Sequence, residues 1–309
     1  VFDDLATELL HWHYRLGHHP FPRLKQMAKL GILPKHLCDA PVTACSTCKH
    51  AKARRRAWKG KEGEVRKIYK QNITFPGECV SIDQLESSVP GLIGQIKGIL
   101  TKRRYLVATI FVDHFSGLVF PVLQQSTSAK ETVEAKESFE LHSSTFGVKI
   151  KHYHADNGCF ADNLFRESVA RGNQTLSFSG VGIHSQNGKA EKRIQDLQGA
   201  ARTMLIHAER QWPTAINSHL WPYALRLASD VLNHSPRDHQ EASPVELFTG
   251  VKMRPLVDKF HHFGCPTFVL LSDLQSGKKG RKWDNRARVG IYLGRSNQHA
   301  RSVSLILSL

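Results

Sequence analysis

Two histidines and two cysteines near the start of the chain, His13-x4-His18 and Cys45-x2-Cys48, constrain its fold more than any other feature of the sequence. Imidazole and thiolate are the ligands that a tetrahedral structural zinc site prefers. The histidines lie about one helical turn apart, and the cysteine pair completes the set from a distant turn. A segment of this size buries too little apolar surface to fold alone, so a metal would supply the missing stability.

The other interpretation of this segment is a histidine-rich stretch that merely titrates. His11 precedes His13 by two positions, which on a helix points its side chain elsewhere, and Cys38 has no close cysteine partner. We therefore exclude His11, His19 and Cys38 from the ligand set. The prediction is a small helical zinc domain over residues 1–57 with a core of its own.

The charge balance indicates a polyanionic partner. The chain has 43 Lys+Arg against 27 Asp+Glu, a net charge of +16, and such an excess favours nucleic acid binding. Ten basic and two acidic residues give the stretch 49–70 a charge of +8, half of the total. This stretch is either a solvated linker or a phosphate-binding segment. We identify Lys52, Arg54, Arg55 and Arg56 as candidate DNA contacts.

Several protein classes are excluded by composition. The longest apolar run, 105–112, is far shorter than the roughly 20 residues of a bilayer-spanning helix, and the mean hydropathy is −0.34. No secretory signal opens the chain. A Cys-x2-Cys pair in a chain with room for its own core favours metal ligation in a reducing compartment over disulfides. We expect an intracellular, non-secreted piece of a longer polyprotein, because the chain begins without Met and ends within an apolar stretch.

Alternating strands and helices predict a mixed α/β core. Expected strands lie at 79–85, 104–113, 118–123, 148–154 and 175–178, and expected helices begin near Ser128, Asp162, Gly188, Leu220 and Ser243. Beyond Pro255, short β-like stretches at 267–271 and 289–293 surround a basic loop. They predict a small β-barrel at the end of the chain.

Three acidic residues occupy positions that can converge at one edge of the predicted sheet. Asp83 lies in the first strand, Asp156 just beyond the fourth, and Glu191 in the first turn of the long helix. Converging carboxylates repel one another unless divalent cations such as Mg²⁺ or Mn²⁺ neutralise them. Two such ions about 4 Å apart support phosphoryl transfer. Asp113 competes with Asp83 for the first position, because it also ends an apolar strand.

Taken together, these motifs resemble the integrase of copia-type LTR retrotransposons over nearly the whole chain. Trp12-His-Tyr-Arg-Leu-Gly-His18 and Cys45-Ser-Thr-Cys48 are similar to that family's HHCC (GAG-pre-integrase-like) zinc domain. Ser81-Ile-Asp83, His154-Ala-Asp-Asn-Gly158 and His184-Ser-Gln-Asn-Gly-Lys-Ala-Glu191 resemble its RNase H-like catalytic core. His262-Phe-Gly-Cys265 and Lys282-Trp-Asp-Asn-Arg-Ala-Arg-Val-Gly-Ile-Tyr-Leu-Gly294 resemble its SH3-like module.

The resemblance implies an organisation and a reaction. It implies a zinc domain at 1–57, a basic linker at 58–77, a five-stranded RNase H-like core with a helical extension at 78–250, and an SH3-like β-barrel at 256–309. Asp83, Asp156 and Glu191 would be the catalytic D, D and E that hold Mg²⁺ or Mn²⁺, and Asp113 a non-catalytic acid. Water would attack a phosphodiester near each element end, and the freed 3′-hydroxyl would attack target DNA. The partners would be double-stranded DNA and further copies of the chain, in the nucleus. Lys189, Lys192 and Arg193 flank the glutamate and are candidate phosphate contacts.

The chain departs from the family pattern at three places. The Asp156–Glu191 spacing is one residue shorter than usual, Ser185 replaces a common proline, and Gly91, Gly94 and Gly98 indicate a loop inserted between Asp83 and Asp113. None of these changes removes a ligand. Two rival functions remain open: an RNase H-like nuclease that cuts without joining, and a zinc-containing nucleic-acid-binding protein whose triad is vestigial.

Overall fold

The computed structural model describes residues 4–53, 73–94, 101–179, 188–237, 240–252, 256–296, 299 and 303–309. Within these ranges, no helix combines the length and the apolar character needed to cross a membrane. The first range folds into short helices: α1 (Leu5–Arg15), α2 (Phe21–Lys29), the 3-10 helix η1 (Lys35–Cys38) and α3 (Ser46–Ala51). The predicted helical segment is thus present at the start of the chain.

A mixed five-stranded sheet follows, in the order β3-β2-β1-β4-β5. The strands are β1 (Val80–Leu92), β2 (Arg104–Asp113), β3 (Val119–Gln124), β4 (His152–Ala155) and β5 (Thr175–Phe178). β1, β2 and β3 pair antiparallel, whereas β4 runs parallel to β1 and β5 runs parallel to β4. This is the strand arrangement of an RNase H-like core, and the predicted fold class is confirmed.

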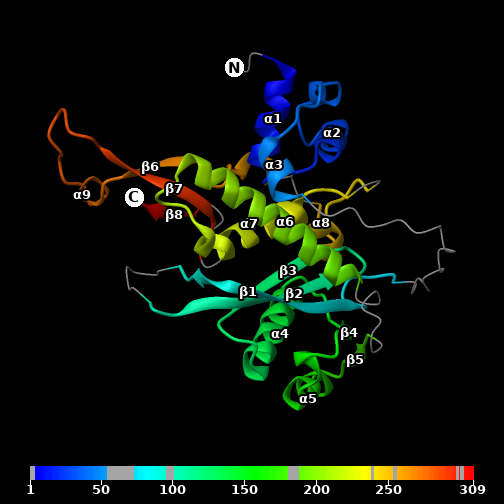
Figure 1. Cartoon of the computed structure of the whole chain (residues 1–309). Helices are drawn as coiled ribbons and strands as arrows, with labels where there is room; N and C mark the ends of the chain where they lie inside the picture. The colour runs from blue at the N-terminus through cyan, green and yellow to red at the C-terminus, as the bar shows by residue number, and fades with distance from the viewer. Residues whose placement is uncertain are drawn as a thin grey trace.

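The two faces of the sheet bury different helices. Val80 and Ile82 of β1 pack with Phe139 of α4 (Ala129–Ser144) and Phe165 of α5 (Asn163–Arg171). Leu85, on the opposite side of the pleat, packs with helices α6 (Gly188–Gln211) and α7 (Trp221–His234). Figure 1 shows α6 between the sheet and the N-terminal helices, with α4 and α5 on the far side of the sheet.

The ends of α4 follow from local chemistry. The Ser128 hydroxyl accepts a hydrogen bond from the Glu131 amide, as expected for an N-cap. Ser128 and Glu131 have the spacing of a capping box, but the box is incomplete, because the Glu131 carboxylate accepts from the amides of Gln125 and Ser126 instead of from Ser128. Just past the helix, Gly147 has a φ of +73°, which only glycine adopts without strain.

The residues between Asp83 and Asp113 correct the prediction of an inserted loop. β1 continues to Leu92, and its pairing with β2 resumes at Gly91↔Tyr105 after a register shift that follows Glu86. Gly91 therefore lies in an extended strand and not in the predicted loop, whereas Gly94 follows the end of β1. Gly98 lies outside the described residues.

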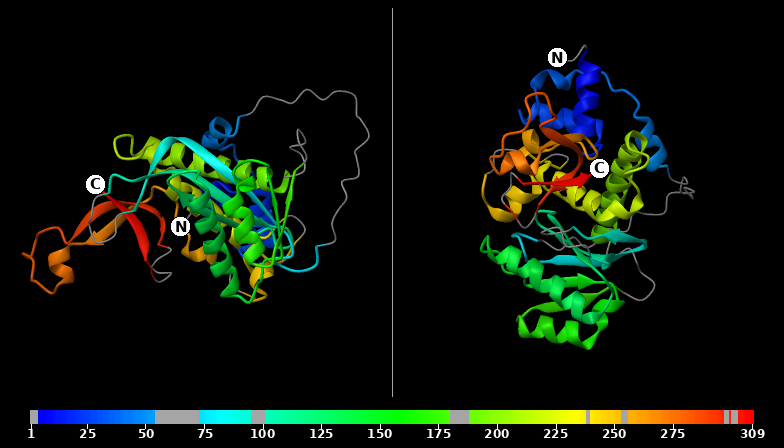
Figure 2. Two further views of the ribbon diagram at one scale, coloured as in Figure 1. Left: turned by 90° about the horizontal axis from the view of Figure 1, so that it is seen from below. Right: turned by 90° about the vertical axis from the view of Figure 1, so that its left-hand side faces the viewer.

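The last part of the chain forms a three-stranded antiparallel sheet of β6 (Pro266–Leu270), β7 (Ala287–Arg295) and β8 (Ser304–Ser308). It lies against α7, where Arg295 pairs with Asp230 at 3.5 Å. In Figure 2 the β6–β7 hairpin projects away from the core. Closure into an SH3-like barrel stays a prediction. The remaining short elements are η2 (Cys159–Ala161), η4 (Ser218–Leu220), α8 (Pro244–Thr249), η5 (Leu256–Lys259) and α9 (Ser272–Gln275).

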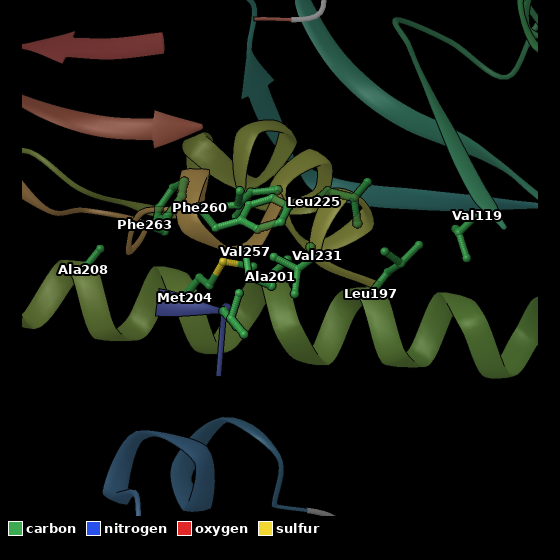
Figure 3. Packing of buried hydrophobic residues seen from close by; sticks show 14 of the residues in the cluster. Val119, Leu197, Ala201, Met204, Ala208, Leu225, Val231, Val257, Phe260 and Phe263 are labelled. Atoms are coloured by element: carbon green, nitrogen blue, oxygen red, sulfur yellow. The ribbon is translucent and has the colours of Figure 1, made fainter. Parts of the chain in front are cut away.

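One hydrophobic cluster joins all three parts of the chain. It contains Leu9 of α1, Leu16 at the C-cap of α1, Leu197 and Met204 of α6, and Ile291 of β7. All five side chains are at most 1% exposed. Figure 3 shows the α6 side chains of this cluster against Phe260 and Phe263. The expectation that the N-terminal segment has a separate core is therefore wrong. Its helices are too short to cover their own apolar faces, so they share those of α6.

Candidate metal centres

The four predicted zinc ligands come together at the base of α1. His13 lies in the last turn of the helix, and the chain then reverses through Gly17 and His18, whose φ values are +59° and +60°. The reversal returns His18 toward His13, and the His18 amide donates to the His13 carbonyl at 2.7 Å. Cys45 is the N-cap of α3 and accepts from the Cys48 amide, so one helical turn presents both sulfurs.

The distances among these ligands fit a single ion. Their ligand atoms all lie within 4.8 Å of one another. His13 Nε2 is 3.2 Å from His18 Nδ1 and 3.3 Å from Cys48 Sγ, while both sulfurs are 3.6 Å from His18 Nδ1. A tetrahedral zinc ion with ordinary bond lengths requires about 3.3 Å between nitrogens and about 3.5 Å between nitrogen and sulfur. The residues present therefore fit zinc.

Burial keeps the imidazoles in the form that binds metal. Burial lowers the pKa of His13 to about 4 and moves the pKa of His18 well below its ordinary value, so both rings are neutral at neutral pH. Without an ion, burial raises the pKa of the Cys48 thiol to about 12, so metal binding would have to displace its proton. Lys52, a predicted DNA contact, donates to the His18 carbonyl at 3.2 Å and supplies positive charge beside the sulfurs.

Residues excluded from the ligand set take other places. His11 is exposed, and the Cys38 thiol faces the Lys25 carbonyl at 3.9 Å. His19 is buried, and its carbonyl accepts from His13 Nδ1 at 2.8 Å. His207 and His262 were not predicted as site residues, and they form a second compact group with His18. Nothing in the sequence pattern indicated them, because they belong to later segments of the chain.

Two of the three acidic residues are neighbours at the end of the parallel pair β1 and β4. Ile82 pairs with Ala155, so Asp83 and Asp156 are the next positions in the same register on strands about 4.8 Å apart. Asp83 shares a pleat face with Leu85, which packs in the α6 cluster. Glu191 lies in the first turn of α6, directly after the fully buried Ala190. The strand register therefore makes Asp83 and Asp156 neighbours, and Glu191 lies at the start of the helix that packs on the Asp83 face of β1.

The pKa of Asp83 depends on its burial and on the charges of Asp156 and Glu191. The pKa of Asp83 rises from 3.8 to about 6, first through burial and then through the negative charges of Asp156 and Glu191. The Gln84 amide donates to Asp83 at 2.8 Å, and the Asn157 amide donates to Asp156 at 2.7 Å. Among the described side chains, only the two histidine-containing groups have every ligand atom within 4.8 Å of the others. The acids thus form a more open arrangement than the zinc ligands.

Asp113, the rival for the first acidic position, is 1% exposed and has structural partners. Its carboxylate accepts from the Gly77 amide at 2.8 Å and from the amide and hydroxyl of Ser116 at 2.7 and 2.6 Å. These bonds fix the turn between β2 and β3. Asp113 therefore acts as an anchor of the β2–β3 turn.

The predicted phosphate contacts near Glu191 differ in accessibility. Lys192 is exposed and pairs with Asp196 at 2.8 Å, whereas Arg193 is only 8% exposed and lies 3.8 Å from the same carboxylate. Cys159, which was not predicted as a site residue, lies near Asp83. Burial is the main cause that raises the pKa of the Cys159 thiol to about 11, and the negative charge of Asp83 adds to the rise. The Lys189 side chain and Arg54, Arg55 and Arg56 lie outside the described residues.

The raised pKa of Asp83 predicts a pH-dependent cost in stability. Between pH 3.8 and about 6 the unfolded chain ionises this group and the folded chain does not, so stability falls as pH rises and the loss persists above pH 6. The shift corresponds to about 3 kcal/mol, which solvent screening reduces to about 1–2 kcal/mol. In zinc-containing, Mg²⁺-free buffer, Asp83→Asn should therefore stabilise the protein by that amount at pH 7.5 and have little effect at pH 4. Urea denaturation measures both; a variant less stable than wild type at pH 7.5 contradicts the assignment.

Comparison with known proteins adds a family for the first segment. Residues 3–53 match the sequence model of the GAG-pre-integrase domain. That range contains all four predicted zinc ligands. A search of curated proteins finds no match.

Solved structures similar to this chain include retroviral integrases. The catalytic core domain of HTLV-2 integrase, in complex with magnesium, is 18% identical with a TM-score of 0.40, over 56% of this chain and 97% of that chain. The simian T-cell lymphotropic virus intasome, in complex with a PP2A regulatory subunit, is 15% identical with a TM-score of 0.44, over 76% of this chain and 79% of that chain. The catalytic core domain of BIV integrase is 16% identical with a TM-score of 0.39, over 56% of this chain and 95% of that chain. The chain thus combines a match to the GAG-pre-integrase domain over residues 3–53 with a mixed five-stranded sheet of RNase H-like strand order.

Proposed function

We propose that this chain is a DNA-integrating polynucleotidyl transferase, the integrase of a copia-type LTR retrotransposon. One observation carries the proposal: the parallel register of β1 and β4 makes Asp83 and Asp156 neighbours, and Glu191 lies in the first turn of α6. The negative charges of Asp156 and Glu191 also contribute, after burial, to the raised pKa of Asp83. Three carboxylates gathered in a chain of net charge +16 are typical of a divalent cation site that works on a polyanion. The match of residues 3–53 to the GAG-pre-integrase domain supports the same family.

Asp83, Asp156 and Glu191 would hold two Mg²⁺ or Mn²⁺ ions. When bound, such ions activate the attacking oxygen and stabilise the leaving one in phosphodiester chemistry. The chain's own contribution is placement. β1 and β4 hold the two aspartates in adjacent register, and the first turn of α6 would supply the glutamate. Water would be the nucleophile in end processing, and a DNA 3′-hydroxyl would be the nucleophile in strand transfer.

A groove between α3 and α6 is a candidate path for DNA. It is lined by Ala51, Lys52, Gln195, Gln198, Gly199 and Arg202. Gln195, Gln198 and Arg202 follow Glu191 at intervals of four, three and four residues, which places them along one face of α6. Amide and guanidinium groups at this spacing can contact successive phosphates. The groove would lead a DNA strand from the carboxylates toward Lys52 at the end of α3.

DNA binding should depend steeply on salt. Removing one basic side chain that binds a phosphate reduces the slope of log affinity against log salt by about 0.9. Changing Arg54, Arg55 and Arg56 together to Gln should therefore lower the slope by about 3 and weaken binding at low salt. Fluorescence anisotropy with a labelled duplex across a salt series measures both quantities.

A matched variant separates local contacts from net charge. Lys29→Gln, Lys35→Gln and Lys130→Gln together remove the same charge from exposed positions on other surfaces. This control should keep the wild-type slope within experimental scatter. Equal slopes for the two triple variants would show that the basic segment makes no phosphate contacts. Lys52 is left unchanged in both, because it also contacts the His18 carbonyl.

The cutting and joining steps separate this proposal from the nuclease alternative. Purified chain, Mn²⁺ and end-labelled duplex DNA should give both shortened and joined strands. Cutting without joining supports the nuclease, and binding with neither supports a vestigial triad. The resemblance also implies a homo-oligomer that acts in the nucleus, and both stay predictions.

A further inference from the structure

A histidine of the long core helix lies against a candidate zinc ligand. Nδ1 of His207, on α6, is 2.8 Å from Nε2 of His18. The centroid of the His207 ring lies 4.5 Å from the ring centroid of Tyr14 and 4.5 Å from that of His262. Residues from the N-terminal segment, the core helix and the C-terminal segment therefore meet beside the metal centre.

The ligand geometry determines which nitrogen of His18 carries a proton. His18 Nδ1 faces both sulfurs at 3.6 Å and His13 Nε2 at 3.2 Å, so Nδ1 is the atom that would bind the ion. A neutral imidazole that ligates through Nδ1 keeps its proton on Nε2. His18 Nε2–H then donates to His207 Nδ1.

The two ligand histidines are held in different ways. His13 would bind through Nε2, and its Nδ1–H donates to the nearby His19 carbonyl at 2.8 Å. His18 depends on a partner that is 189 positions away in the sequence. Hydrogen bonds of this kind fix the orientation of a ligating ring and raise its basicity, and their loss typically costs about 10–100-fold in metal affinity.

A second metal ion is the competing explanation, because the ligand atoms of His18, His207 and His262 lie within 4.8 Å of one another. The 2.8 Å separation of His18 Nε2 and His207 Nδ1 is a normal hydrogen-bond length. It is shorter than the roughly 3.3 Å expected between two nitrogens on one tetrahedral ion. The distance therefore favours a hydrogen bond over shared coordination.

We propose that His207 is an outer positioning residue of the N-terminal zinc centre, so that zinc binding and the packing of residues 4–53 on α6 stabilise each other. Other contacts join the same surfaces: Gly17 lies against Met204, Arg202 donates to the Ala51 carbonyl at 3.4 Å, and Arg210 donates to Thr47 at 3.2 Å. The inference rests on the proposed zinc site and is independent of strand transfer. It connects zinc occupancy to the helix whose first turn carries Glu191.

The test is zinc affinity of the full chain, measured by competition with a chromophoric chelator. His207→Ala should bind zinc about 10–100-fold more weakly than wild type. His207→Asn, whose amide oxygen can replace Nδ1, should stay within about 3-fold of wild type, whereas His207→Gln, whose amide is one carbon further out, should lose affinity as alanine does. His262→Ala removes a ring contact of His207 without removing a ligand hydrogen bond, and should stay within about 3-fold.

Several results overturn the inference. Wild-type affinity in both His207→Ala and His207→Gln would show that His207 does not support the ligand. Equal affinities of the Asn and Gln variants would show that the Nδ1 acceptor is irrelevant. Two metal ions per wild-type chain, with one lost in His262→Ala, would establish the second-metal explanation instead. A wild-type chain that binds no zinc would remove both the zinc site and this role, while leaving the carboxylate site untouched.

Discussion

Replacing Asp83, Asp156 or Glu191 with its amide should abolish Mg²⁺-dependent cleavage and joining, with a loss of at least about 10³-fold for each variant. The amide keeps the size of the side chain but removes the charge that holds the cations. Because the three residues would act as a unit, double variants should lose little more than single ones. DNA affinity should stay within about 3-fold, since the contacts that bind the backbone lie elsewhere. Labelled-oligonucleotide cleavage and joining assays measure the loss.

Asp113→Asn is the matched control for these variants. Its carboxylate accepts bonds on both oxygens, so an amide nitrogen would face a donor and cost about 1–3 kcal/mol of stability. Activity should nevertheless persist at temperatures where the variant stays folded. Full activity in Asp83→Asn, or complete loss in a folded Asp113→Asn, would reassign the first acidic position.

Removing zinc should loosen the N-terminal segment and the α6 side of the core together. Structural zinc sites contribute about 10–16 kcal/mol of apparent binding free energy, and here α1 and α2 share one cluster with α6 and α7. In hydrogen exchange, chelation should therefore deprotect α1–α3 and the half of α6 that contains Met204. Helices α4 and α5 pack in the other cluster and should stay protected.

The cysteines provide an internal control for the zinc prediction. Cys48→Ser should reduce bound zinc to near zero and reproduce the exchange pattern of the chelated protein. Cys38→Ser should leave zinc and exchange unchanged, because its sulfur lies against the Lys25 carbonyl and outside the ligand group. Deprotection confined to residues 4–53 would show that the shared cluster does not couple the two parts.

The sequence predicted those features that depend on local spacing. The His-x4-His and Cys-x2-Cys patterns indicated one ligand group because each pair lies within one turn of chain. Asp83 and Asp156 could be placed at one sheet edge because parallel strands end at the same side. The positions of the five strands along the chain followed from the alternation of apolar strands and helices. Each of these inferences uses residues close in sequence or a general rule of sheet topology.

Contacts between distant segments were not predictable in this way. His207 approaches His18 only because the N-terminal helices pack on α6, and no periodicity in either segment reports the other. The structural role of Asp113 depends on the Gly77 amide, 36 positions away. The extension of β1 was missed because Gly91 is typical of a loop, although a shifted register accommodates it in the strand.

The most direct test of the proposed transferase is covalent joining of DNA ends to a target. Labelled duplexes with randomised terminal base pairs are incubated with plasmid DNA, Mn²⁺ and the purified chain, so that the preferred element-end sequence is selected by the reaction itself. Sequencing of the junctions should show labelled 3′ ends joined to many plasmid positions, enriched for particular terminal sequences, and absent with Asp83→Asn. Plasmid cutting without junctions, or binding with neither cutting nor junctions, would contradict the proposed function.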